Sequence, residues 1–131
     1  MAGRAWDWFR QSERDLEHAH SAHQGRMYEW ACFASHQAAE KALKALFIYH
    51  GREVWGHSVV QLLRLLESIV EVPPDLLDVG RRLDQFYIPT RYPNAHPTGA
   101  PFEFFTQSQS EEALHFAQQI VEFARAHMAL P

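Results

Sequence analysis

The sequence has few of the features that mark secreted, membrane-spanning or general DNA-binding proteins. It holds a single cysteine, Cys32, so no disulfide can form within the chain. No apolar run approaches the roughly 20 residues that cross a bilayer, and the first residues lack the basic and then apolar layout of a secretion signal. The formal net charge of -4 offers no general attraction for nucleic acid. We therefore expect a cytoplasmic protein, with no membrane partner, that holds any polyanion through a few local cations.

The size and composition are those of one folded domain. The chain has 131 residues, of which 47% are hydrophobic and 21% charged, which excludes a disordered chain and leaves too little sequence for two cores. No segment alternates apolar and polar residues for long enough to predict a strand. The sequence therefore predicts an all-α protein with a single domain over residues 1–131.

Apolar residues recur at helical spacing in five segments. These segments run from Ala5 to about His23, from Met27 to near Gly51, from Ser58 through Ile69, from Pro74 to about Phe86, and from Ser108 to Met128. Ser58 is a suitable N-cap, Pro74 suits a first helical turn, and Ser108 and Glu111 have the spacing of a capping box. A loop with Gly25 separates the first two helices.

The second predicted helix has a stripe of alanines that lets neighbouring helices approach closely, so we expect it to be central. Gln37, Glu40, Lys41 and Lys44 form its polar face. These four residues either form a solvated surface or line a cleft beside the candidate site described next.

A long loop from Tyr87 to Thr106 contains four prolines, which makes it stiff and too proline-rich for regular structure. Loops of this length are often functional. Within it, Arg91 and His96 stand five positions apart between prolines. A guanidinium fits phosphate oxygens, and an imidazole donates or accepts a proton near neutral pH. The alternative is that Arg91 binds helix-terminal carbonyls and His96 is an exposed turn residue.

These two groups are the ones that metal-free RNA cleavage requires. The ribose 2′-hydroxyl attacks the adjacent phosphorus, one group removes its proton, another protonates the leaving oxygen, and a cation stabilises the developing charge. One histidine cannot easily make both proton transfers at once. A symmetric homodimer would supply two histidines and two arginines to one cleft, so the mechanism predicts a homodimer.

The sequence resembles the HEPN (higher eukaryote and prokaryote nucleotide-binding) family. The resemblance lies in WACFASHQAAEKALKALF over residues 30–47, in Gly56-His57 before a leucine-rich helix, and in YIPTRYP over residues 87–93. It implies an up-and-down four-helix bundle with an additional short helix and a long proline-rich loop before the last helix. It also implies a tendency to dimerise and a partnership with a minimal nucleotidyltransferase. Many members are ribonucleases whose motif is an arginine, four to six residues and a histidine, which Arg91 and His96 match.

The leading hypothesis is therefore the toxin-type, metal-independent ribonuclease of a two-component system, with RNA or a nucleotide as ligand. Catalytic members commonly have a small polar residue or histidine after the arginine, whereas this chain has Tyr92. That difference favours the alternative, a non-catalytic nucleotide- or partner-binding subunit that works with a nucleotidyltransferase. We expect no cofactor and no metal site. The predicted ligand-binding residues are Tyr92, Asn94, His57, Lys41, Lys44 and Glu40, although His57 could instead order the turn from Gly51 to Ser58.

Two further features of the sequence have mainly structural explanations. His20 and His23 stand one turn apart, but no second pair accompanies them, and scattered surface histidines are more common than a metal site. Tryptophan and phenylalanine are more numerous than one small core requires. Some of these rings are therefore expected on an exposed patch that mediates self-association.

Overall fold

The computed structural model describes residues 2–128, and within that range it is all-helical, as the sequence predicts. Two single-turn 3-10 helices interrupt the long loop, η1 (Pro93–Ala95) and η2 (Pro101–Glu103). The five α-helices are α1 (Ala2–Gln24), α2 (Tyr28–Tyr49), α3 (Val59–Leu66), α4 (Pro74–Asp84) and α5 (Gln107–Ala126). No helix within residues 2–128 combines the length and the apolar character needed to cross a bilayer.

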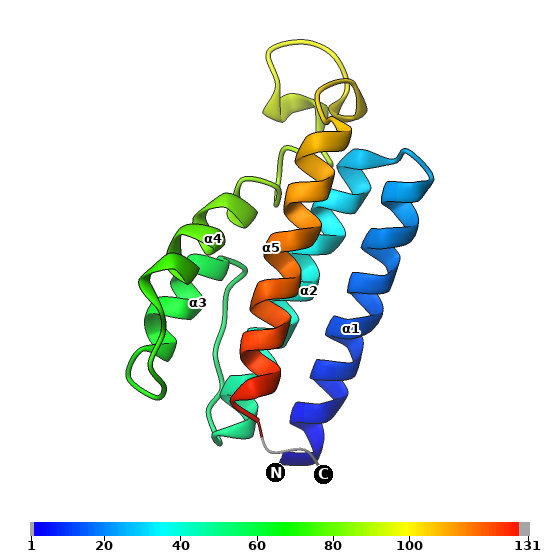
Figure 1. Ribbon diagram of the computed structural model, residues 1–131. Coiled ribbons are helices and arrows are strands. Elements are labelled where there is room, and N and C mark those ends of the chain that lie inside the picture. The colour runs from blue at the N-terminus through cyan, green and yellow to red at the C-terminus, as the bar shows by residue number, and fades with distance from the viewer. Residues whose placement is uncertain (1, 129–131) are drawn as a thin grey trace.

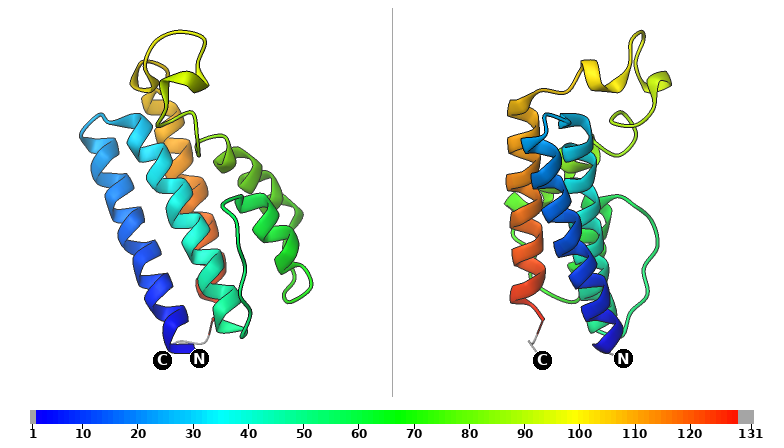
Figure 2. Two further views of the ribbon diagram at one scale, coloured as in Figure 1. Left: turned by 180° about the vertical axis from the view of Figure 1, so that it is seen from behind. Right: turned by 90° about the vertical axis from the view of Figure 1, so that its right-hand side faces the viewer.

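The helices form the predicted bundle (Figure 1). Helices α1, α2 and α5 are long and lie side by side, and α3 and α4 form a shorter hairpin against them, with α3 on α2 and α4 on α5 (Figures 1 and 2). Helices α1, α2, α4 and α5 alternate in direction, so α3 is the additional short helix. The segment 51–58 runs back along the bundle from the end of α2 to the start of α3 (Figure 1).

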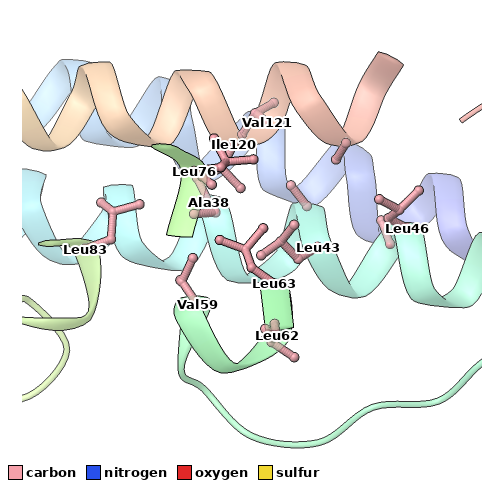
Figure 3. Packing of buried hydrophobic residues seen from close by; sticks show 14 of the residues in the cluster. Ala38, Leu43, Leu46, Val59, Leu62, Leu63, Leu76, Leu83, Ile120 and Val121 are labelled. Atoms are coloured by element: carbon pink, nitrogen blue, oxygen red, sulfur yellow. The ribbon is translucent and has the colours of Figure 1, made fainter. Parts of the chain in front are cut away.

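The alanine stripe places α2 at the centre of the bundle, which confirms the prediction. Ala38, Ala39 and Ala42 are fully buried, and α2 packs against α1 on one side and α5 on the other. The buried Ser12 hydroxyl donates a 2.7 Å hydrogen bond to the Ala38 carbonyl, which shows how closely α1 approaches α2. Leucines of α2, α3 and α4 meet Ile120 and Val121 of α5 in the same core (Figure 3).

The predicted helix ends are partly confirmed. Ser58 caps α3 by accepting a hydrogen bond from the Gln61 N–H, and Pro74 stands in the first turn of α4. The predicted capping box of the last helix is wrong by two residues. Thr106 and Gln109 form it, and Ser108 lies inside the first turn. Both pairs have the same chemistry and spacing, and Thr106 has the extended backbone that an N-cap requires.

Other boundaries also differ from the prediction. Helix α1 begins at Ala2 rather than Ala5, and α3 ends at Leu66, short of Ile69. The loop between α1 and α2 contains Gly25, as predicted, and its left-handed residue is Arg26, with φ of 63°. The long loop contains two 3-10 turns where no regular structure was expected. Each of them begins at a proline, whose fixed φ suits a first helical position.

Candidate functional site

The loop that connects α4 to α5, residues 85–106, projects beyond the end of the bundle where α1 turns into α2 (Figure 1). Its base is fixed by the buried hydroxyl of Thr90, which donates a 2.6 Å hydrogen bond to the Phe86 carbonyl. Gly99 has φ of 82°, and a Cβ there would lie 3.0 Å from the Phe104 ring. The loop is therefore held in one conformation by its own contacts as well as by its prolines.

Arg91 is enclosed by aromatic rings. Its Nε donates a 2.8 Å hydrogen bond to the Tyr87 carbonyl. The guanidinium carbon lies 4.3 Å from the ring centroid of Phe33, 4.7 Å from that of Tyr87 and 4.9 Å from that of Tyr92. No carboxylate forms an ion pair with Arg91 within residues 2–128. The side chain is thus an oriented cation whose charge remains available to an anion.

His96 is oriented by a different set of contacts. Its Nε2 donates a 2.7 Å hydrogen bond to the Pro89 carbonyl, which fixes the tautomer with the proton on Nε2. The ring stacks on Phe104 with centroids 4.6 Å apart and an interplanar angle of 10°. The other ring nitrogen, Nδ1, has no hydrogen-bond partner within the described residues. It is the nitrogen of His96 that could exchange a proton with a ligand.

The two predicted catalytic residues therefore share a loop but have separate supports. No hydrogen bond or ring contact joins Arg91 to His96 in the part of the chain that the structure describes. Of the two predicted ligand-binding residues between them, Tyr92 is 47% exposed, and its hydroxyl lies 3.5 Å from Nη1 of Arg91. Asn94 lies in η1 and is exposed.

A second polar group lies on α2 beside the segment 51–58. Glu40 accepts hydrogen bonds from Lys44 at 2.9 Å and from Nδ1 of His57 at 3.1 Å, both through Oε2. Its other oxygen, Oε1, is the only buried side-chain oxygen or nitrogen without a hydrogen-bond partner in the described residues. Glu40 is only 4% exposed, so it does not belong to a solvated face, and its place in a ligand-binding cleft stays a prediction.

Tyr87 connects this polar group to Arg91. The His57 ring stacks on the Tyr87 ring with centroids 5.1 Å apart and an interplanar angle of 18°. Arg91 lies over the same tyrosine. His57 therefore ties the segment 51–58 to α2, as the structural alternative proposed, and it also extends the surroundings of Arg91 toward Glu40 and Lys44.

Asp84 anchors the start of α3 to the end of α4. Its carboxylate accepts hydrogen bonds from Nε2 of His36 at 3.2 Å, from the Ser58 hydroxyl at 2.7 Å, and from the N–H groups of Val59 and Val60 at 2.7 and 3.2 Å. Burial by itself raises the pKa of Asp84, but these hydrogen bonds to the charged form outweigh burial and hold the pKa below its ordinary value of 3.8.

Lys41 lies apart from the other predicted ligand-binding residues. It forms an ion pair with Asp15 of α1, and both line a small pocket between α1 and α2. The residues that the sequence predicted to bind one ligand therefore lie in three neighbouring sets. One set is built around Arg91 and Tyr92, a second around Glu40, His57 and Lys44, and a third around Lys41.

Comparison with known proteins identifies the family. The HEPN domain family matches residues 5–127 of this chain. The chain belongs to the HEPN family. It is also 26% identical, over 124 residues, to a Methanocaldococcus jannaschii protein named "Putative toxin MJ1304", with 88% of this chain and 82% of that protein aligned.

Solved structures show the same fold. A Thermus thermophilus protein, TT1696, superposes with a TM-score of 0.93 at 46% identity, covering 95% of this chain and 98% of that one. An archaeal HEPN homologue has a TM-score of 0.79 at 39% identity, covering 93% and 95%. A HEPN domain protein from Thermotoga maritima has a TM-score of 0.76 at 35% identity, covering 92% and 95%. The resemblance stated from the sequence motifs is thereby confirmed.

Several residues of this HEPN domain's site were missed by the sequence prediction. Phe33, His36, Tyr87 and Asp84 all contact it; the first three lay within quoted motifs but were given no role, and Asp84 lay outside them. His36 precedes Glu40 by one helical turn, so a ligand-like pair on one face of α2 was the available signal. No such signal marks Asp84, because its partners are 24 to 48 residues away in the sequence.

The structure also describes two features that lie outside the site. Cys32 is buried, and burial together with the nearby charge of Glu29 raises its pKa to about 12. Within residues 2–128, no three histidine, cysteine, aspartate or glutamate side chains are grouped as a metal site would require.

Proposed function

We propose that this chain, a single HEPN domain over residues 1–131, is a toxin-type endoribonuclease that cleaves cytoplasmic RNA without a metal ion. The observation that carries the proposal is the state of Arg91. It is oriented by the Tyr87 carbonyl and three aromatic rings, it has no carboxylate partner within the described residues, and it shares a loop with His96. The name of the Methanocaldococcus jannaschii relative supports the toxin assignment.

In the proposed reaction, Arg91 binds the scissile phosphate and stabilises the charge that develops on its oxygens. The ribose 2′-oxygen forms a bond to phosphorus as the bond to the 5′-oxygen breaks. A base takes the proton of the 2′-hydroxyl, an acid gives a proton to the leaving 5′-oxygen, and the products carry a 2′,3′-cyclic phosphate and a 5′-hydroxyl. Nδ1 of His96 is the nitrogen free to act as one of these groups.

The second proton transfer is the reason to propose a homodimer. His96 is the histidine of the loop, and in one step it can serve as base or as acid but not as both. A second copy of the chain would bring the other His96 to the same cleft. A minimal nucleotidyltransferase is proposed as the second component of the system, as the family resemblance implies.

A second candidate function is a nucleotide-binding subunit without catalysis. It is favoured by the separate supports of Arg91 and His96 and by Tyr92, whose exposed ring beside the guanidinium suits a stacked base. In this case Arg91 binds a phosphate and His96 has only a structural role.

Incubation of purified protein with total RNA in excess EDTA separates these functions. The ribonuclease predicts cleavage that falls by about a hundredfold or more in Arg91→Ala and in His96→Ala. Arg91→Lys should also lose most activity, because an ammonium lacks the planar fork that stacks on the rings. Arg64→Ala and His20→Ala are matched controls, since both side chains are exposed and neither forms a hydrogen bond or ion pair within the described residues.

The binding subunit predicts a different result. The wild-type protein should leave RNA intact, and a nucleotide should raise the thermal unfolding midpoint of the wild type but not of Arg91→Ala. Cleavage that persists unchanged in both Arg91→Ala and His96→Ala would reject the assignment of this loop as the catalytic site.

A further inference from the structure

A pocket of about 240 Å³ opens between α1 and α2, next to Arg91. None of the roles proposed above uses it. Two aromatic side chains, Trp30 and Phe33, form part of its wall together with polar groups from both helices. The polar residues are Asp15, His18, Gln37 and Lys41. A pocket of this size holds one heterocyclic ring system rather than a whole nucleotide.

The aromatic wall is continuous with the arginine. Trp30 and Phe33 meet edge to face with ring centroids 6.3 Å apart, and the guanidinium of Arg91 lies 4.3 Å from the Phe33 centroid. Trp30 is 44% exposed, although it is one of the largest apolar side chains of the molecule. A flat ring that enters the pocket would therefore meet an exposed indole while a phosphate attached to it remains within reach of Arg91.

Among the polar groups of the pocket, Lys41 is ion-paired with Asp15, and the Gln37 side chain presents an acceptor to a ligand. Because Nε2 of His36 donates to Asp84, its Nδ1 accepts the 3.3 Å hydrogen bond from the Gln37 amide nitrogen. The amide oxygen of Gln37 is left without a partner within residues 2–128. Asp15 adds a carboxylate, which accepts hydrogen bonds from Gln11 and Lys41. Acceptors of this kind match the exocyclic amino groups of adenine and cytosine better than the carbonyl edge of uracil.

We propose that this pocket binds an amino-bearing nucleobase of single-stranded RNA, adenine or cytosine, whose neighbouring phosphate lies on Arg91. Trp30 provides the stacking surface and Gln37 recognises the amino group. The inference rests on the phosphate-binding role of Arg91 in the proposed function, but it requires no cleavage.

Binding of tetranucleotides that cannot be cleaved tests the proposal. Fluorescein-labelled A4, C4 and U4 with 2′-O-methyl riboses lack the attacking hydroxyl, and fluorescence anisotropy gives the dissociation constants. We expect the wild type to bind A4 and C4 at least about fivefold more tightly than U4. Trp30→Ala should weaken A4 binding by about tenfold, since one stacked base is lost. Gln37→Leu should reduce the preference for A4 over U4.

Leu65→Ala is the matched control, because Leu65 is a large apolar side chain of α3 with 45% exposure and does not line the pocket. Trp30→Leu keeps apolar bulk and replaces Trp30→Ala if the latter has a lowered thermal midpoint. The proposal is overturned if the wild type binds no tetranucleotide at millimolar concentration, if it shows no preference among them, or if both Trp30 variants bind A4 as the wild type does. An equal loss in Leu65→Ala also overturns it.

The other possible occupant of the pocket is a second copy of the chain, and sedimentation of the same variants tests it by measuring the oligomeric state. If Trp30→Ala changes the oligomeric state and leaves A4 binding unchanged, a second copy of the chain occupies this face and the nucleobase proposal is rejected. Binding and cleavage measurements together also separate the base pocket from the ribonuclease. Tetranucleotide binding that depends on Trp30, in a protein that leaves RNA intact, supports the base pocket and rejects the ribonuclease.

Discussion

Arg91 and Asp84 illustrate two opposite uses of a charged side chain in this domain. The charge of Arg91 is balanced by aromatic faces and a carbonyl oxygen and stays open to an anion. The charged carboxylate of Asp84, in contrast, accepts hydrogen bonds from four donors within the fold, which belong to His36 and residues 58–60. The first residue is therefore suited to a ligand, and the second to stability.

Asp84→Asn should destabilise the domain by about 1–3 kcal/mol at pH 7, the usual effect of weakening several hydrogen bonds to a partly buried charged group. The pKa of Asp84 is lower in the folded than in the unfolded chain, so its contribution is complete above the unfolded value of 3.8. It is lost as the pH falls below 3.8 through the folded pKa. Urea unfolding between pH 7 and pH 3 should therefore show wild type and variant converging at the acid end.

Glu71→Gln is the control for this series, because Glu71 is exposed and has no hydrogen-bond partner within the described residues. A difference between Asp84→Asn and wild type that stays constant down to pH 3 would contradict the role assigned to the Asp84 carboxylate.

At the level of single residues, the sequence predicted candidates that lie close together along the chain, but not the contacts that each of them makes in the fold. Arg91 and His96 were found because both residue types and their spacing fall within one loop. The rings around Arg91 come from α2 and from the start of the loop, which the sequence alone does not bring together. Glu40 was placed on the polar face of the second helix, but it is buried, and it accepts a hydrogen bond from His57, which lies 17 residues away in the sequence.

At the level of helices, the close packing of α3 against α4 depends on Gly80. A Cβ at this position would lie 3.0 Å from the Val60 backbone and 3.0 Å from the Leu63 side chain. Helix propensity alone favours alanine over glycine by about 1 kcal/mol, but the backbone of Val60 cannot move aside as a side chain can. We therefore expect Gly80→Ala to be net destabilising by about 1–3 kcal/mol, the typical cost of overpacking.

Gly3→Ala provides the matched comparison, since Gly3 is also helical and a Cβ there would meet no atom within 4 Å. Chemical unfolding should show Gly3→Ala to be neutral or slightly more stable than the wild type. If the two alanine variants have equal stability, the distance between α3 and α4 is not limited by Gly80.

The helices themselves were predictable because their periodicity, proline positions and one cap are local. Helix ends were less so. Thr106 and Ser108 are both good N-caps with a suitable partner three residues later. Thr106 is the cap because the chain that follows η2 is extended at Thr106 and already helical at Ser108. Likewise, Gly25 and Arg26 compete for the left-handed position of the turn, and local preference for glycine did not decide it.

At the scale of the whole molecule, the bundle ends in a surface that the proposed reaction requires to be duplicated. The predicted all-α bundle is confirmed by the five α-helices of residues 2–128. The pairing of two such surfaces stays a prediction, because the contacts of one chain do not show where a second chain binds. Exposed rings of the loop at this end, Tyr92, Phe102 and Phe104, give a surface that two copies could share.

Mixing of two inactive variants tests the shared site directly. If one cleft contains an arginine and a histidine from each copy, a dimer of one Arg91→Ala chain and one His96→Ala chain keeps one intact residue of each kind. Equal amounts of the two variants, allowed to exchange subunits, should recover only a small part of the metal-free RNA cleavage, because the single histidine supports one of the two proton transfers. Either variant alone stays inactive. Sedimentation with differently tagged chains establishes that mixed dimers have formed.

Mixed dimers that remain as inactive as the parent variants would show that each cleft needs both of its arginines or both of its histidines, or that the two loops do not meet. A chain doubly substituted at Arg91 and His96, mixed with wild type, distinguishes these explanations, because a cleft built from one copy alone would retain full activity per wild-type chain.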